Sequence, residues 1–411
     1  MKTIGNSYYK SKDLKEIYGV SRQTVSKWVE SVKNGKLNLE MIDENGQSYI
    51  RNTPANNVII AELVKSRQKF KNSKSLRTIS PTEDFYKLYS PEQITDIIVN
   101  LRVHHEIPRQ YNYIDEGAAY WDKYSTKLFN DSDANNPLHS TEELMQLNQA
   151  YLDELLSQYK KVNVVDIGPG NALPVKSLLS HLIDQDKLGR YTAIDISPEM
   201  LEIAHQNIKR WFSDKVDFVA ELKDVNFERF TDLLMTDSPD EGSVNLVLFF
   251  GGTLHNLRSI DEALRTIYHS MTPPDIFICP LKLDTEDTRR NFHFNAGLEA
   301  QQLPPQHKFL VDLLGIEPDL YEVEIGFDEE TRSRYLRLKL KVSLTINIEL
   351  QRKNQSIHLN KNDTLLVWRY WHQTAQEIIE QFERNGFGVL QATQTKEHDC
   401  MLTICDVKPE R

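Results

Sequence analysis

The sequence predicts an α/β protein in which a doubly wound sheet carries an inserted α+β lobe and follows a small helical domain. Apolar strands alternate with amphipathic helices from about residue 160 to residue 283, as in a parallel sheet covered by helices on both faces. Residues 333–351 instead alternate polar and apolar side chains, which predicts one long antiparallel strand with a solvated face. The 411 residues exceed the usual size of a single hydrophobic core, so two or three units are expected.

Charge is distributed unevenly along the chain. Residues 1–80 contain 15 Lys and Arg against 7 Asp and Glu, whereas the remainder contains 34 against 53, so a head of net charge +8 precedes a body of −19. This asymmetry predicts different partners for the two parts. No apolar run is long enough to span a membrane, and the first residues lack the apolar core of a signal peptide. Together with the presence of only three cysteines, this favours a cytoplasmic protein.

A metal site is not expected. Cys400 and Cys405 lack the spacing of a zinc-binding pair, and no HExxH motif or carboxylate group accompanies His104 and His105. The other histidines are scattered along the chain.

The basic head predicts two helices joined by a tight turn. Gly19 supplies the permissive backbone of the turn, and Ser21 is a good N-cap for the second helix. The predicted apolar faces consist of Leu14, Ile17 and Val20 in the first helix and Val25, Trp28, Val29 and Val32 in the second. The segment LKEIYGVSRQTVSKWV resembles the helix-turn-helix of MerR-like and excisionase-like DNA-binding domains.

This resemblance implies that residues 1–75 bind duplex DNA, as a homodimer where two half-sites are recognised. The contacts would come from the exposed N-terminal end of the second helix, through Arg22, Gln23, Thr24 and Lys27. The alternative is a small helical domain that docks on another protein. The basic, acid-free stretch 64–78 adds phosphate contacts or forms a solvated linker, with the domain boundary between Lys71 and Pro81.

The segment VVDIGPGNALPVK, Val164 to Lys176, predicts a buried strand, a sharp loop and a helix. We expect Asn171 to cap this helix and Pro174 to lie in its first turn. A dinucleotide-binding loop would carry a third glycine, but Leu173 stands there. The loop therefore suits a ligand in lighter backbone contact, such as the amino-acid part of S-adenosylmethionine (SAM).

Acidic side chains follow the next strands. Asp195 lies 27 residues after Gly168 at the end of a second strand, where a carboxylate can accept both hydroxyls of a ribose. A third strand ends near Asp224, which we expect to hold the adenine amino group, with Glu221 as an alternative. A fourth apolar segment, 244–256, breaks at Gly251. Polar groups at successive strand ends predict a Rossmann-like sheet with SAM over its carboxyl edge, and hence a SAM-dependent methyltransferase.

Three segments, VVDIGPGNALPVK, AIDISPEML and LFFGGTLHNL, resemble the histidine-specific methyltransferase family. The predicted SAM-binding residues are Asp166, Gly168, Gly170, Lys176, Asp195, Ile196, Asp224, Phe250 and Gly251. The resemblance further implies that Asn256 holds the acceptor amino acid and that Tyr113 contacts it. Phe292 is another acceptor-binding candidate. His255 is either a loop histidine bonded to backbone or a group that orients the acceptor or takes its proton.

Departures from the family pattern concern the acceptor. The segment ANNPLHSTEE lacks the tyrosine that the family uses to bind substrate. Trp368 and Tyr370 fall near the positions of the Glu and Ser that grip the histidine imidazole. Tryptophan cannot accept an imidazole N–H, so we expect an acceptor that is larger or more apolar than histidine. The aromatic clusters YWDKY and WRYW either pack in the core or form the walls of its pocket.

The expected organisation is thus a helix-turn-helix domain, a methyltransferase domain of residues 82–283 and 373–411, and an acceptor-binding lobe of residues 284–372. Residues 374–386 predict the last helix, followed by a closing strand pair. The alternative function is a DNA-binding regulator whose degenerate methyltransferase body senses SAM or another metabolite.

Overall fold

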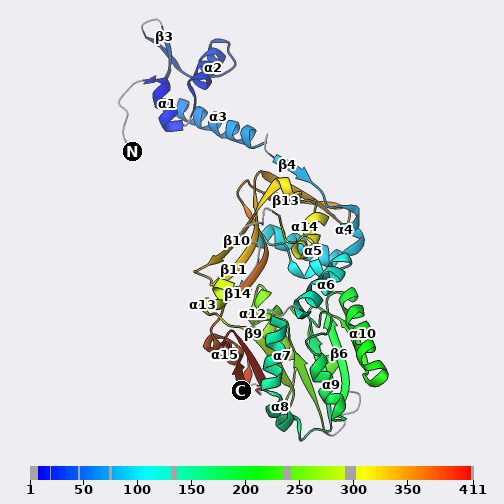
Figure 1. Ribbon diagram of the computed structural model, residues 1–411. Coiled ribbons are helices and arrows are strands. Elements are labelled where there is room, and N and C mark those ends of the chain that lie inside the picture. The colour runs from blue at the N-terminus through cyan, green and yellow to red at the C-terminus, as the bar shows by residue number, and fades with distance from the viewer. Residues whose placement is uncertain are drawn as a thin grey trace. The chain divides into compact units, whose positions relative to one another are not determined.

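The computed structural model describes residues 8–18, 20–44, 47–73, 76–130, 137–234, 242–291 and 302–408. Gly19 and Phe292 lie outside the described residues. The chain divides into two compact units, residues 1–77 and residues 78–411 (Figure 1). Within the described ranges, no helix combines the length and apolar character that crossing a bilayer requires.

The N-terminal unit packs helices against a small antiparallel sheet. Its elements are β1 (Tyr8–Tyr9), α1 (Ser11–Tyr18), α2 (Arg22–Lys33), β2 (Met41–Glu44), β3 (Gln47–Arg51) and α3 (Pro54–Ser73). The strands lie in the order β1-β3-β2. Leu14, Val25, Trp28, Ile50 and Ile60 form its buried core.

Two helices lie where the sequence predicts them in this unit. Ser21 caps α2, because its hydroxyl accepts a hydrogen bond from the Thr24 backbone N–H at 3.3 Å. Two expectations are wrong. Ile17 is 47% exposed rather than buried, and Thr24 is buried, with its hydroxyl 2.9 Å from that of Ser21. Thr24 therefore supports the helix cap and does not face solvent.

The second unit is built on a seven-stranded sheet of order β15-β16-β9-β8-β5-β6-β7 (Figure 1). Its strands are β5 (Lys161–Ile167), β6 (Leu188–Asp195), β7 (Phe218–Leu222), β8 (Ser243–Leu248), β9 (Ile276–Lys282), β15 (Phe387–Gln394) and β16 (Cys400–Val407). Strands β5 to β9 pair in parallel, whereas β16 pairs antiparallel with β9 and β15. The expected closing strand pair is present as β15 and β16, which are antiparallel to each other.

Helices cover both faces of this sheet. They are α8 (Gln149–Leu156), α9 (Lys176–Asp184), α10 (Pro198–Phe212), α12 (Ile260–Ser270) and α15 (Ala375–Arg384). The first three share one core with Val162 and Val164 of β5. Helices α12 and α15 share a separate core with Val165 and Ile167. Neighbouring side chains of a strand point to opposite faces, so β5 is buried on both sides, as a doubly wound sheet requires.

A third core joins residues 85–114 to residues 303–370. Its elements are α4 (Glu83–Leu88), α5 (Pro91–Val99), α14 (Phe309–Leu313), β10 (Tyr321–Asp328), β11 (Ser333–Leu340), β12 (Ser343–Leu350), β13 (Lys353–Leu359) and β14 (Thr364–Trp371). Strand β11 lies between β10 and β14, and β12 pairs with β13 in another sheet.

The expectation of one long strand over residues 333–351 is wrong, because β11 and β12 are separate strands in different sheets. Lys341 and Val342 separate them. Leu340 and Leu344, on either side of the break, are both buried. The alternation of polar and apolar residues therefore continues across the break, and the pattern does not show where β11 ends.

The remaining elements connect these cores. They are β4 (Leu76–Ile79), which spans the boundary between the units, a π-helical turn (Asn100–His104), α6 (Glu116–Asn130), α7 (Pro137–Leu147), α11 (Thr231–Leu234), α13 (Glu286–Asn291), and the short 3₁₀ helices Arg109–Tyr113, Ser213–Lys215, Thr253–Asn256, Pro305–His307 and Pro318–Leu320.

Candidate active site

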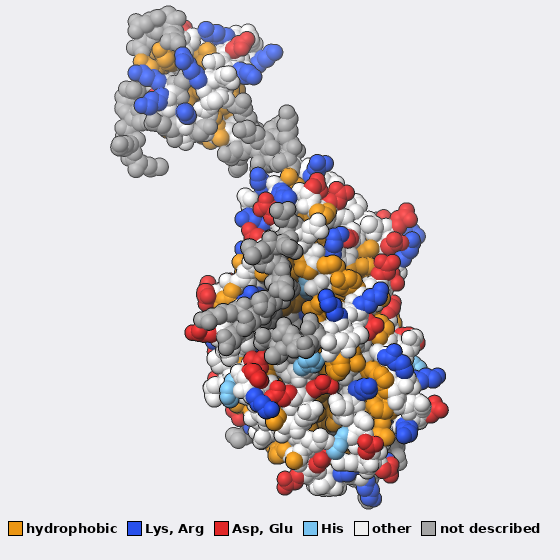
Figure 2. Space-filling model, viewed as in Figure 1, with side chains coloured by type: hydrophobic (Ala, Val, Ile, Leu, Met, Phe, Trp, Pro, Cys, Tyr) orange, Lys and Arg blue, Asp and Glu red, His pale blue; other side chains and the backbone are white. Residues whose placement is uncertain are grey.

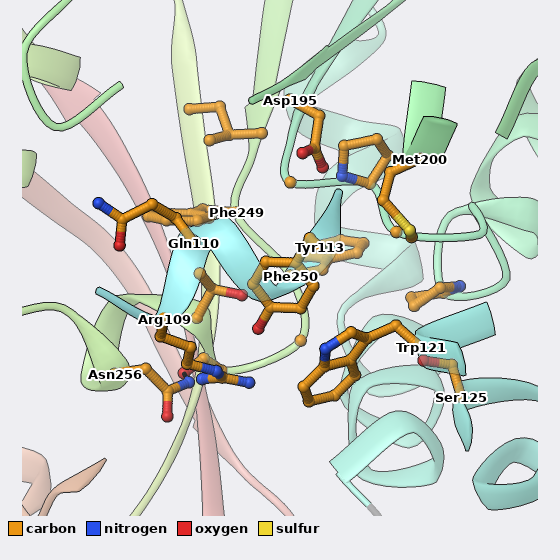
Figure 3. A pocket seen from close by; sticks show the side chains of 18 of the residues that line it. Arg109, Gln110, Tyr113, Trp121, Ser125, Asp195, Met200, Phe249, Phe250 and Asn256 are labelled. Carbon is orange, nitrogen blue, oxygen red and sulfur yellow. Dashed lines mark hydrogen bonds between the residues drawn. The ribbon is translucent and has the colours of Figure 1, made fainter. Parts of the chain in front are cut away.

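A cavity of about 920 Å³ lies at the carboxyl ends of the parallel strands β5, β6 and β8 (Figure 3). This is where an open α/β sheet binds its ligands. Loops from the sheet form one side, and α6, the 305–307 turn and strand β14 contribute to the other. The predicted site residues that line the cavity are Tyr113, Asp166, Gly168, Gly170, Asp195, Ile196, Asp224, Phe250, Gly251, Asn256, Trp368 and Tyr370.

The glycine loop follows β5 directly. Gly168 and Gly170 have φ angles of +62° and +57°, a backbone conformation that side chains disfavour. Asn171 does not cap the next helix as expected. Its side-chain oxygen accepts from Leu173 N within the loop, and α9 begins only at Lys176. The extra loop residues place Pro174 at the cavity instead of in the helix.

Asp195 and Asp224 face the same cavity from neighbouring strand ends. The Asp195 carboxylate accepts a hydrogen bond from Ser197 N at 3.0 Å, which orients it at the start of α10. Removal from water raises its pKa to about 6, while backbone hydrogen bonds oppose this rise and the charge of Asp224 adds to it. Asn226 donates to Asp224 through its backbone and side chain, at 3.0 and 2.8 Å. Glu221 is not a lining residue, so Asp224 remains the candidate of the two.

Asp166 is buried at the end of β5. One carboxylate oxygen accepts a hydrogen bond from the Tyr191 hydroxyl at 2.9 Å. The other is buried without a hydrogen-bond partner among the described residues. Burial raises the pKa of this carboxyl to about 7, although the Tyr191 hydrogen bond acts against the rise. A buried acceptor without a partner at a cavity wall suits a ligand that donates a hydrogen bond.

The adjacent residues His255 and Asn256 have different environments. The Asn256 amide nitrogen donates to Gly252 O at 3.0 Å, and its side-chain oxygen has no partner within the described part of the chain. His255 is completely buried outside the cavity lining, with Nε2 2.9 Å from the Gln373 side-chain oxygen. Burial lowers its pKa to about 3, so the ring is neutral. We therefore do not retain His255 as a catalytic candidate.

Lys176 is also not brought to the cavity. Its ammonium group lies 4.9 Å from the centroid of the Trp211 ring, at the start of α9. This cation–π contact explains the position of the Lys176 ammonium group without requiring a ligand. Its predicted contact with SAM has no counterpart in the lining.

Aromatic side chains line the cavity opposite the strand ends. Tyr113, Trp121, His307, Trp368 and Tyr370 form a chain of aromatic rings whose neighbouring centroids lie 4.9–6.3 Å apart, here called the aromatic wall. Tyr113, Trp368 and Tyr370 are predicted site residues, whereas Trp121, His307 and the nearby Arg109 are lining residues that the sequence did not single out. Trp121 belongs to the YWDKY cluster that the sequence left open between core and pocket. His307 and the nearby Arg109 lie in segments without a recognisable motif.

A seven-stranded sheet of this order, with its ligand cavity at the carboxyl edge, defines a SAM-dependent methyltransferase with SAM as the methyl donor. The chain belongs to the family described as histidine-specific methyltransferase, SAM-dependent, which matches residues 94–407. A search of curated proteins finds no match.

Several solved methyltransferase structures resemble the chain. A SAM-dependent methyltransferase from Clostridium acetobutylicum is 10% identical, with coverage of 72% of this chain and 100% of that one and a TM-score of 0.37. The CcbJ methyltransferase from Streptomyces caelestis is 13% identical, with coverage of 71% and 98% and a TM-score of 0.35. The 1,6-didemethyltoxoflavin-N1-methyltransferase from Burkholderia thailandensis is 12% identical, with coverage of 78% and 92% and a TM-score of 0.36.

Proposed function

We propose that the protein N-methylates a small amine, an amino acid or a related compound, that is not free histidine. The observation that carries this proposal is the single cavity that gathers Gly168, Gly170, Asp195 and Asn256 at the sheet edge. SAM would lie on the strand-end side, defined here as Gly168, Gly170, Asp195 and Asp224. The loop amides would contact its amino-acid part, Asp195 the ribose hydroxyls and Asp224 the adenine amino group.

The acceptor would lie between Asn256 and the aromatic wall. Trp368 and Tyr370 are both 6% exposed and stack at 25° with centroids 6.1 Å apart, so they present a flat surface without a carboxylate. Such a surface favours flat or apolar groups and offers no ionised partner for an imidazole. The side-chain oxygen of Asn256 would accept a hydrogen bond from the acceptor amine.

The residues have to position the amine more than activate it. SAM supplies a sulfonium-bound methyl group that is already a strong electrophile. The amine lone pair forms the new N–C bond while the S–C electron pair remains on sulfur, which yields S-adenosylhomocysteine, and the methylated ammonium releases its proton to water. Asn256 and the aromatic wall would hold the nitrogen in line, which is the main source of rate enhancement here.

Turnover tests the proposal. The purified full-length protein is incubated with methyl-labelled SAM and a panel of amino acids and amines, and labelled products and S-adenosylhomocysteine are quantified by mass spectrometry. We expect equal amounts of both with at least one amine, and none in its absence. SAM binding without methyl transfer to any amine would favour a sensor and contradict the proposal.

We further propose that the N-terminal unit binds duplex DNA. Arg22, Gln23, Ser26 and Lys27 are all exposed at the N-terminal end of α2. On its visible face, Lys and Arg dominate the charged side chains of this unit, whereas both signs are mixed over the second unit (Figure 2). Short polar and basic groups on an exposed helix end suit phosphates and base edges. Sequence-specific binding would require a homodimer that contacts two half-sites.

Fluorescence titration of labelled duplex DNA with the full-length protein at about 50 and 200 mM salt tests this. We expect affinity to fall steeply with salt and with the double substitution Arg22→Ala and Lys27→Ala. Lys36→Ala, at an exposed lysine beyond α2, is the matched control and should have a smaller effect. If duplex DNA does not bind at the lower salt concentration, the unit instead docks on a protein.

A further inference from the structure

Arg109 carries a positive charge into the cavity beside the aromatic wall. Its guanidinium carbon lies 5.1 Å from the Trp121 ring centroid and 5.6 Å from that of Tyr113. Its Nε is buried without a hydrogen-bond partner among the described residues, and no acidic side chain there forms an ion pair with it. The ring nitrogen of Trp121 is a second buried donor without a partner in the described ranges. The guanidinium also hydrogen-bonds the Tyr113 hydroxyl, but its Nε and the Trp121 ring N–H are left as two buried donors without an acceptor among the described residues.

The charge of Arg109 acts on the acceptor side of the cavity. Burial raises the pKa of Tyr113 and lowers that of His307; the Arg109 charge opposes the rise at Tyr113 and adds to the fall at His307. Figure 3 shows Arg109 and Asn256 together on one side of the pocket, and Asp195 and Met200 on the other. In this view the cation lies on the side of Asn256 and away from Asp195, the predicted ribose site.

We propose that Arg109 binds a carboxylate of the acceptor, whose flat body lies against the aromatic wall. The inference rests on the proposed function and assigns a specificity-determining residue of the same site, the group that holds the carboxylate of the acceptor. Guanidinium suits this task because it remains charged, stacks on aromatic rings and donates to both carboxylate oxygens. Trp121 would add its ring N–H to the same group.

The arrangement also explains how the acceptor amine could be held neutral. A neighbouring positive charge disfavours protonation of an amine, and only the neutral amine has a lone pair for methyl transfer. The same guanidinium would thus select the anionic acceptor and increase the fraction of its reactive form.

A binding experiment that needs no turnover tests the anion site. The full-length protein is saturated with S-adenosylhomocysteine and titrated in a calorimeter with 3-phenylpropionate and with its neutral amide, 3-phenylpropanamide. We expect wild type to bind the carboxylate at least tenfold more tightly than the amide. Arg109→Gln should abolish this preference, and Arg109→Lys should retain part of it. The control is Arg337→Gln, because Arg337 also lies over a ring, at 4.3 Å from the centroid of Tyr335, but outside the cavity.

Several results would overturn the proposal. These are failure of 3-phenylpropionate to bind, equal binding by wild type and Arg109→Gln, or a matching loss of SAM affinity in that variant, which would place Arg109 on the methyl donor. Melting curves test whether Arg109→Gln is folded. If it is not, the comparison of wild type with Arg109→Lys provides the test. Arg109-dependent carboxylate binding without methyl transfer to any amine would support the anion site while contradicting the proposed function.

Discussion

The two sides of the cavity differ in chemistry and in construction. The strand-end side is acidic and consists of short loops that follow parallel strands, with Asp195 and Asp224 oriented by nearby backbone N–H groups. The aromatic wall, with Arg109 beside it, combines residues 113–121 with residues 307–370. Carboxylates that are oriented by backbone N–H groups suit a ligand that all members of a family share. A wall of packed side chains can instead be altered by substitution to fit a different acceptor. We therefore expect the strand-end side to bind the donor and the aromatic wall to set the specificity for the acceptor.

The largest effect is expected at Asn256, in the short 3₁₀ helix that follows β8. Asn256→Ala removes the amide that would position the acceptor nitrogen, and small misplacements of reacting atoms cost about 100-fold in rate. We expect kcat/KM to fall by about this factor with SAM affinity retained, measured by steady-state kinetics and calorimetry. Asn354→Ala, at an exposed position on β13, is the control. A loss of less than threefold would remove Asn256 from the acceptor site.

Free histidine should be a poor acceptor. The wall offers Trp368 and Tyr370 but no carboxylate for the imidazole N–H, and an unpaired buried polar group costs about 1–3 kcal/mol. We expect kcat/KM for histidine at least tenfold below that for a carboxylated amine with a larger planar group. Efficient trimethylation of histidine would show that the wall does not select against it.

SAM affinity should depend on pH through Asp195. Because its pKa is raised to about 6, this carboxyl is ionised at pH 8 and protonated at pH 5. Charge-assisted hydrogen bonds are roughly twice as strong as neutral ones, so affinity should fall about tenfold as pH decreases through 6. SAM affinity is measured by calorimetry across this pH range for wild type and for Asp195→Asn, and the affinity of the variant should change less with pH. Equal pH profiles would exclude Asp195 as the titrating group.

The smallest effect on activity is expected at His255, behind the cavity. His255→Gln can keep a hydrogen bond to Gln373 but disturbs edge-to-face packing on Tyr370, whose ring centroid lies 5.1 Å away. Unfolding free energy should fall by about 1–2 kcal/mol, while kcat of the folded protein stays within about twofold. Loss of activity as large as that of Asn256→Ala would return His255 to the active site.

The sequence predicted that Gly168, Asp195 and Asp224 come together at one cavity, because the relevant information is local. Gly168, Asp195 and Asp224 each come at or shortly after the end of a strand, and parallel strands bring their carboxyl ends to one edge of the sheet. The start of α10 follows the same local logic, because the Ser197 hydroxyl caps this helix by accepting a hydrogen bond from Met200 N.

The aromatic wall was less predictable because it depends on packing between distant segments. Arg109 and His307 are almost 200 residues apart, and neither belongs to a pattern that marks a cavity. Local patterns also failed at the break between β11 and β12. One long strand and two consecutive strands show the same alternation of polar and apolar residues, so the pattern cannot distinguish them. Lys176 shows the reverse error, since a matching motif position was expected to bind SAM, but its side chain lies over Trp211.

The division of the cavity into a donor side and an acceptor side is tested most directly by SAM calorimetry on two variants. Asp195→Ala removes two charge-assisted hydrogen bonds, each worth roughly 1.5–3 kcal/mol, so affinity should fall about 100-fold or more. Arg109→Gln should leave SAM affinity unchanged. The account is contradicted if Asp195→Ala binds SAM like wild type, or if Arg109→Gln loses as much affinity as Asp195→Ala.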